Sequence, residues 1–120
     1  MERKMERADI AIIGTGPGGV SATLTAKVRN KNILLIGKKQ MSDKVSKAHQ
    51  IMNYPGLPAV TGADMAKAFE KQLAMMEINI TDSRIGTVYA MGDYFAIQAG
   101  GEVLEAKSVI LACGVVSGKT

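Results

Sequence analysis

The sequence predicts an α/β domain in which a mainly parallel sheet carries helices and a small antiparallel meander. Three observations lead to this fold class. Residues 8–13 and 33–36 are short, almost continuous apolar runs, which is typical of strands buried on both faces of a parallel sheet. A helical segment over residues 20–29 separates them, so the three segments predict a right-handed β-α-β unit. After residue 84, apolar and polar residues alternate, as expected of antiparallel strands.

The first predicted helix, at residues 20–29, carries small residues that allow a close approach to the sheet. Ala22 and Ala26 lie four residues apart, so they share one face of the helix. Leu24 and Val28 are its larger predicted packing groups.

An irregular segment, residues 37–62, precedes the second predicted helix. Prolines at positions 55 and 58 and the glycine at 56 break regular structure there. Thr61 and Asp64 form a predicted capping box, and the helix is expected to end near Met76. Its predicted buried face holds four residues at helical spacing: Met65, Phe69, Leu73 and Met76.

The remaining chain is read as strands. They are predicted at residues 78–81, 85–90, 94–99, 102–106 and 108–112. The second to fourth of these form the antiparallel meander, with turns at Gly92-Asp93 and Gly100-Gly101. The first and the last are predicted to join the parallel sheet.

Composition excludes several classes of function. Cys113 is the only cysteine, so the 120 residues hold no internal disulfide, no C-x-x-C redox pair and no cysteine-based metal cluster. We expect no metal site, and His49 is interpreted as a loop residue. No apolar run reaches the roughly 20 residues that span a bilayer, and the N-terminus lacks a signal-peptide pattern, so we expect a cytoplasmic protein without membrane contact. The net charge is +4, but no aromatic residue accompanies the lysines of residues 38–47, so nucleic-acid binding is not expected.

A glycine-rich loop follows the first strand and opens the first helix. It matches G-x-G-x-x-G with the residues Gly14, Thr15, Gly16, Pro17, Gly18 and Gly19. In a Rossmann-like fold the first glycine permits the tight turn, the second lets backbone approach a pyrophosphate, and the third lets helix and strand pack closely. Backbone N–H groups at the helix N-terminus then face the phosphates. The placement between strand and helix predicts a dinucleotide site; the alternative is a glycine turn kept for packing alone.

The end of the second strand lacks the acid that binds ribose in NAD-specific domains. The residues there are Ile36, Gly37, Lys38 and Lys39. An NAD-specific domain is therefore disfavoured. Either lysine could face the 2′-phosphate of NADP or lie in solvent, and the sequence leaves both open.

Together these motifs resemble the thioredoxin reductase branch of the FAD-dependent pyridine nucleotide–disulfide oxidoreductases. The resemblance covers almost the whole chain. It rests on G-T-G-P-G-G at 14–19, I-L-L-I-G at 33–37, N-Y-P-G-L-P at 53–58 with T-G at 61–62, and V-I-L-A-C-G at 109–114. The N-Y-P-G segment is the most discriminating, because a generic nucleotide-binding fold does not need it.

The resemblance implies that FAD is the cofactor. The loop from Gly14 to Gly19 would then hold the pyrophosphate, and Gly37 with Lys38 would lie beside the adenosine ribose. It further implies three groups of contacts: Asn53 on the flavin side, Val88 meeting the adenine through its backbone, and Ala112 with Gly114 lining the cofactor. No residue of the chain is expected to be catalytic.

Two local departures from the family pattern stand out. The family's G-G-Q-type segment is replaced by the sequence of residues 42–50, which puts contacts near the isoalloxazine ring and the usual electron donor in question. Cys113 stands where the family usually has threonine, and we expect a small buried thiol there rather than a redox group.

In domain terms we expect a basic tail at residues 1–7 and a FAD-binding domain at 8–120. By the resemblance, this domain lacks the NADPH domain with its C-x-x-C pair and the C-terminal FAD segment of an intact member. An intact parent would pass electrons from NADPH or another donor through FAD to a thioredoxin-like disulfide protein. The chain alone is expected to be inactive as a disulfide reductase, to bind FAD weakly or not at all, and to self-associate through residues 108–112. Alternatives are the FAD half-site of a flavin monooxygenase or oxidase, and a non-catalytic NAD(P)- or FAD-binding module.

Overall fold

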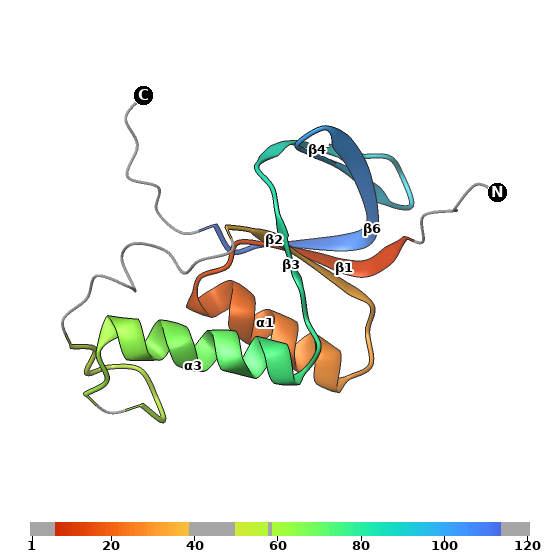
Figure 1. Ribbon diagram of the computed structural model, residues 1–120. Coiled ribbons are helices and arrows are strands. Elements are labelled where there is room, and N and C mark those ends of the chain that lie inside the picture. The colour runs from red at the N-terminus through yellow and green to blue at the C-terminus, as the bar shows by residue number, and fades with distance from the viewer. Residues whose placement is uncertain (1–6, 39–49, 58, 114–120) are drawn as a thin grey trace.

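The computed structural model describes residues 7–38, 50–57 and 59–113. In these ranges its elements are β1 (Ala8–Ile13), α1 (Pro17–Val28), β2 (Ile33–Gly37), α3 (Gly62–Met75), β3 (Ile80–Asp82), β4 (Ile85–Ala90), β5 (Phe95–Ala99) and β6 (Glu102–Leu111). The strands form one six-stranded sheet in the order β3-β2-β1-β6-β5-β4. Helices α1 and α3 cover one face of its parallel part, and the meander curls over the other (Figure 1). The predicted three-layer, Rossmann-like α/β fold is confirmed.

The parallel part of the sheet sets the geometry of everything that follows. Strand β1 lies at its centre, with β2 on one side and β6 on the other, both parallel to it. Strand β3 extends the sheet beyond β2, also in parallel. The carboxyl ends of these strands therefore meet at a single edge, as expected for a sheet built from β-α-β units.

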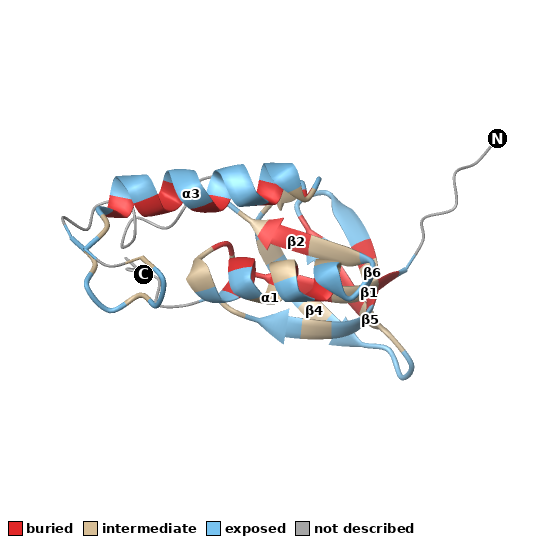
Figure 2. Ribbon diagram, turned by 90° about the horizontal axis from the view of Figure 1, so that it is seen from below, coloured by how far each residue is buried: buried red, intermediate tan, exposed pale blue. Residues whose placement is uncertain are grey.

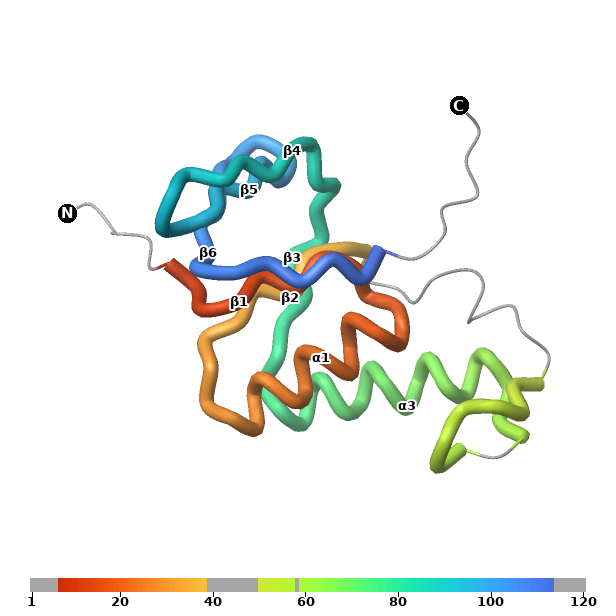
Figure 3. Tube along the Cα trace, turned by 180° about the vertical axis from the view of Figure 1, so that it is seen from behind, coloured from red at the N-terminus to blue at the C-terminus, as the bar shows by residue number. Residues whose placement is uncertain are grey.

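Strand β6 departs from the prediction, which had two separate strands at 102–106 and 108–112. Its first half pairs antiparallel with β5 and its second half pairs parallel with β1. Ala106 is the changeover residue, because it lies opposite both Ala8 and Phe95. No glycine or proline interrupts the chain at this point, so the backbone stays extended while its partner changes. One strand thus joins the meander to the parallel sheet, as the tube in Figure 3 shows.

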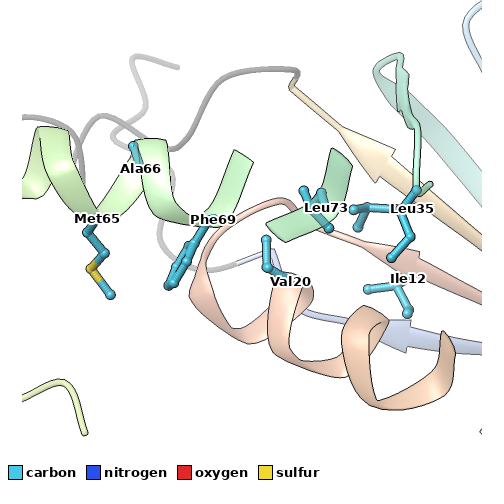
Figure 4. Close-up of a cluster of buried hydrophobic side chains, with 8 residues drawn as sticks. Ile12, Val20, Leu35, Met65, Ala66, Phe69 and Leu73 are labelled. Carbon is cyan, nitrogen blue, oxygen red and sulfur yellow. The ribbon is translucent and has the colours of Figure 1, made fainter. Parts of the chain in front are cut away.

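The larger core lies between the sheet and the two helices (Figure 4). Strands β1 and β2 contribute Ile12 and Leu35, and α1 contributes Val20, all at most 2% exposed. Helix α3 packs on them through one face, coloured red in Figure 2, while its other side is exposed. That face carries Met65, Ala66, Phe69 and Leu73, with Met76 partly buried beside them. The predicted face of this helix is confirmed.

Two further expectations for the helices had different outcomes. The Thr61 hydroxyl accepts a hydrogen bond of 3.1 Å from the Asp64 amide, which confirms Thr61 as the cap of α3. In α1, Ala26 is buried and Leu24 is partly buried, but Val28 is 69% exposed, so its predicted packing role is wrong. Val28 is the last residue of α1 and lies about 200° around the helix axis from the buried Ala26, on the exposed side of the helix. Neither α1 nor α3 has the length and apolarity of a membrane-crossing helix.

A second core lies between the sheet and the meander. Ala11 and Ile36 point to it from the parallel strands, and Ile97 and Ala106 meet them from β5 and β6; all four are completely buried. The alanines let the two layers approach closely. The alternation along β1 and β2 therefore divides their side chains between two cores, which explains why these strands read as continuous apolar runs.

Asp9 joins the amino ends of three segments of the sheet. Its Oδ2 accepts a hydrogen bond of 2.9 Å from the Asn32 amide, and Lys107 Nζ lies 3.5 Å from Oδ1. The Asn32 N–H lowers the pKa of the Asp9 carboxyl below its ordinary 3.8; burial opposes this, and Lys107 adds to it. Because the native pKa is the lower one, the stabilisation is complete above the ordinary value and disappears as pH falls through the native value.

Asp9→Asn is therefore expected to lower the free energy of unfolding at neutral pH. As the pH falls, the variant should lose less of this free energy than the wild type does. Urea unfolding of both proteins between about pH 7 and pH 3 measures this difference. The two unfolding midpoints should converge as the pH falls. A constant gap across the range would show that the Asp9 charge does not contribute.

Candidate dinucleotide site

The glycine loop connects β1 to α1 at the edge where the parallel strands end. Hydrogen bonds join it to both neighbouring strands. The Gly14 amide donates to the Ile36 carbonyl at 2.9 Å, and the Ala112 amide donates to the Ile13 carbonyl at 2.8 Å. The loop, the end of β2 and the residue after β6 thus form one continuous surface, which is where ligands bind in open α/β sheets.

Gly14 and Gly19 are required by the protein's own backbone. Gly14 has a φ of +124°, a conformation that L side chains rarely adopt, and an added Cβ would overlap the Ala112 carbonyl. An added Cβ at Gly19 would overlap the carbonyl of Gly14, where α1 packs against the turn. These two glycines confirm the predicted tight turn and the predicted close helix–strand packing.

Gly16 differs from both. Its φ is −80°, which any residue can adopt, and apart from its chain neighbours no atom of the described residues lies within 4 Å of an added Cβ. Gly18 is similarly free, since the nearest atom to its added Cβ is the Ala112 Cβ at 3.9 Å. Neither packing nor backbone conformation explains a glycine at position 16. An open, side-chain-free backbone at a loop of this kind fits a ligand that approaches closely, as a pyrophosphate does.

The N-terminus of α1 is prepared for an anion. In the described ranges no side chain caps it, and its first turn contains no acidic residue. By contrast, α3 is capped by Thr61 and carries Asp64 in its first turn. Pro17 occupies the first turn of α1, so the N–H groups without an intrahelical acceptor are those of Gly18 and Gly19. These amides and the helix dipole favour negative charge at this point.

Gly37 and Lys38 lie against the glycine loop. The Thr15 hydroxyl donates a hydrogen bond of 2.8 Å to the Lys38 carbonyl. The sequence identified Thr15 as part of the loop but gave no sign of this partner, because the two residues are 23 positions apart. Residues 36–38, at the end of β2, include no acidic residue.

Asn53 lies in a loop that precedes α3. An antiparallel bridge between Ile51 and Val60 closes this loop, and a turn from Tyr54 to Leu57 has Gly56 at a φ of +88°. The Tyr54 ring packs on Phe69 with its centroid 5.7 Å away, which attaches the loop to α3. Asn53 itself is exposed. Its predicted contact with a flavin stays a prediction.

Val88 is located in the middle of β4 in the meander. It is partly buried and packs against the second core, next to the layer that contains Ile36. Gly114, Lys39 and His49 lie outside the described residues. The structure therefore brings together the predicted pyrophosphate segment, residues 14–19, and the predicted ribose segment, Gly37 and Lys38. Val88 lies in the meander, on the other face of the sheet from α1.

Cys113 was expected to be buried and is exposed. It lies two residues after the end of β6, beyond the part of the sheet that β5 covers. Its Sγ lies 3.8 Å from the Ile13 carbonyl oxygen, which it meets as a weak donor. Ala112, one residue earlier, is half-buried and forms the wall opposite Gly14. Within the described ranges, no three histidine, cysteine or acidic residues gather as a metal site.

Comparison with known families decides how this site is classified. The model of the family described as pyridine nucleotide-disulphide oxidoreductase matches residues 8–120. The chain belongs to this family. The match includes the glycine loop, both cores and the meander.

Solved structures and curated relatives agree with this assignment. A ferredoxin-flavin thioredoxin reductase from Clostridium acetobutylicum is 43% identical with a TM-score of 0.91, covering 97% of this chain and 40% of that chain. A thioredoxin reductase from Streptococcus pyogenes is 26% identical with a TM-score of 0.85, covering 95% and 37%. The thioredoxin reductase of Helicobacter pylori is 37% identical over 88% of this chain. The chain spans about a third to two fifths of the length of these relatives.

Proposed function

We propose that residues 8–120 form the FAD-binding part of a thioredoxin-reductase-like flavoprotein oxidoreductase. The observation that carries the proposal is the open backbone at Gly16, which the packing of the described residues does not require. The family assignment and the flavin named in the Clostridium acetobutylicum relative favour FAD over a nicotinamide dinucleotide as its ligand.

The chain's own residues would bind and orient FAD. The amides of Gly18 and Gly19, with the positive end of the α1 dipole, would hold the pyrophosphate, and Pro17 would preset the first helical turn. The remaining proposed contacts follow the sequence prediction: Gly37 and Lys38 at the adenosine ribose, Val88 at the adenine, Asn53 on the flavin side, and Ala112 with Gly114 along the cofactor.

FAD supplies the redox chemistry when it is bound, and the protein supplies its position. In the proposed activity, a reduced donor, NADPH or another, delivers electrons that leave to the disulfide of a thioredoxin-like protein in the cytoplasm. The names of the relatives support this direction of electron flow.

The activity is tested anaerobically with the complete gene product that contains these residues. The protein is incubated with an oxidised thioredoxin-like protein and NADPH, NADH or a reduced protein donor, and the thiols formed are titrated. Thiol formation that requires both donor and flavoprotein is expected, and a Gly16→Asp sample without flavin is the control. In a parallel aerobic sample, donor consumption that depends on oxygen and forms no thiols would indicate a monooxygenase or oxidase instead. Bound FAD with neither reaction would indicate a non-catalytic module.

A homodimer or self-association of the 120-residue chain is also proposed, through the outer edge of β6. Residues 108–111 pair with β1 on one side, and β5 ends its pairing at Ala106, so no described strand covers their other side. Ile110 is 40% exposed and Leu111 is 70% exposed on this segment. An apolar strand edge with free N–H and C=O groups recruits another strand.

Light scattering of the 120-residue chain over a range of concentrations tests this association. The wild-type chain is expected to form dimers or larger species, and Leu111→Lys is expected to weaken them because it places a charge on the edge. Met75→Lys, at an equally exposed position on α3, is the matched control that should leave association unchanged. A strictly monomeric wild-type chain at high concentration would exclude the proposal.

A further inference from the structure

Thr15 makes an unusual connection between the two strands that flank the candidate site. Its side chain is only 9% exposed, and its hydroxyl donates to the Lys38 carbonyl at 2.8 Å. One residue earlier, the Gly14 amide donates to the Ile36 carbonyl at 2.9 Å. The backbone bond continues the sheet, whereas the Thr15 bond extends the connection past the last residue of β2. The glycine loop and Lys38 are thereby held as one unit.

Gly37 lies directly beneath this side chain. An added Cβ at position 37 would be 2.8 Å from Thr15 Cγ2, 3.2 Å from Thr15 Oγ1 and 3.3 Å from the Thr15 amide nitrogen. The φ of Gly37 is not in the left-handed region, so its backbone could be adopted by other residues. The two closest contacts come from the Thr15 side chain. Gly37 is therefore required by Thr15 and not by its own conformation.

We propose that Thr15 is a positioning residue: its side chain crosses Gly37, fixes the backbone at Lys38 and so sets the adenosine side of the dinucleotide site. This inference rests on the proposed function in one respect, because it takes FAD as the ligand of the site. The Thr15 hydroxyl has a single proton, and this proton is already used in the hydrogen bond to the Lys38 carbonyl. Thr15 then has no proton to donate to a phosphate, which leaves the backbone amides to bind the pyrophosphate. The same contact leaves no room for a ribose-binding acid at position 37.

The first test needs no cofactor. Urea unfolding is measured on the complete gene product, freed of any ligand, for wild type, Thr15→Ala, Gly37→Ala and the double variant. Gly37→Ala is expected to lower the unfolding midpoint in the Thr15 background and to lower it much less in the Thr15→Ala background, because both closest contacts are then gone. If Gly37→Ala alone does not fold while the double variant does, the same coupling is shown. An equal effect of Gly37→Ala in both backgrounds would overturn the proposal.

The second test measures FAD affinity by fluorescence quenching in two matched variants. Thr15→Val keeps the shape of the side chain and loses the hydroxyl. Its Kd for FAD is expected to rise about fivefold to tenfold, which corresponds to the free energy of one hydrogen bond. Thr15→Ser keeps the hydroxyl and is expected to stay within about twofold of wild type. Equal affinities of wild type and Thr15→Val would exclude the positioning role even where the stability coupling is found. If the wild type binds no FAD, the proposed function fails, while the coupling of Thr15 and Gly37 is still decided by the first test.

Discussion

Gly16→Asp is expected to abolish FAD binding by the complete gene product without unfolding it. An added Cβ at position 16 meets no atom within 4 Å among the described residues beyond its chain neighbours, and the φ of −80° suits any residue, so we expect the fold to be kept. The carboxylate would occupy the space through which the pyrophosphate approaches, and its charge would repel the phosphates. Flavin absorbance of the purified protein and circular dichroism measure the two effects separately.

Gly16→Ala is the graded control for this prediction. It adds one methyl group and no charge, so its affinity for FAD should fall between those of wild type and Gly16→Asp. A folded Gly16→Asp protein that retains flavin at wild-type affinity would show that the phosphate does not lie at this loop. In that case the glycine pattern would be a packing turn only.

Gly19→Ala is expected to have the opposite profile, with its effect on the fold itself. The added Cβ would overlap the Gly14 carbonyl, which is backbone and cannot turn away as a side chain does. Helix α1 would have to separate from the turn, and we expect a loss of about 3 kcal/mol or more in the free energy of unfolding. Equilibrium urea denaturation with circular dichroism measures it.

Gly18→Ala is the adjacent matched control. Among the described residues outside its own helix turn, its Cβ meets the Ala112 Cβ alone, at 3.9 Å, and alanine is the better helix former. Its unfolding free energy is expected to stay within about 1 kcal/mol of wild type. If Gly18→Ala and Gly19→Ala destabilise equally, the loop geometry described here is wrong.

The sequence predicted the parallel unit and the glycine loop because both depend on local chemistry. The apolar runs of β1 and β2 and the glycines between them specify strand, turn and helix within about 30 residues. Thr61 was recognised in the same way, as a cap that bonds an amide only three residues away. The face of α3 followed from the spacing of its apolar residues.

What could not be predicted depends on partners distant in the chain. Strand β6 changes its partner at Ala106, and alternation alone cannot show that one strand serves two neighbours. Cys113 is exposed because no described strand covers the outer side of β6 near it. The apolar residues before it in the sequence suggested a buried position instead. Val28 lies on the side of α1 opposite the buried Ala26, and the apolar residues of α1 did not show which side faces the sheet. The bond from Thr15 to Lys38 likewise required the loop and the end of β2 to be seen together.

The most direct measurement is the identity and amount of the nucleotide released when the purified complete gene product is denatured. Chromatography with absorbance detection and mass spectrometry distinguishes FAD from FMN, NAD and NADP. We expect FAD in stoichiometric amount from the wild type and none from Gly16→Asp. Release of a nicotinamide dinucleotide in place of FAD, or FAD in equal amount from both proteins, would contradict the assignment of residues 14–19 as the site of the FAD pyrophosphate.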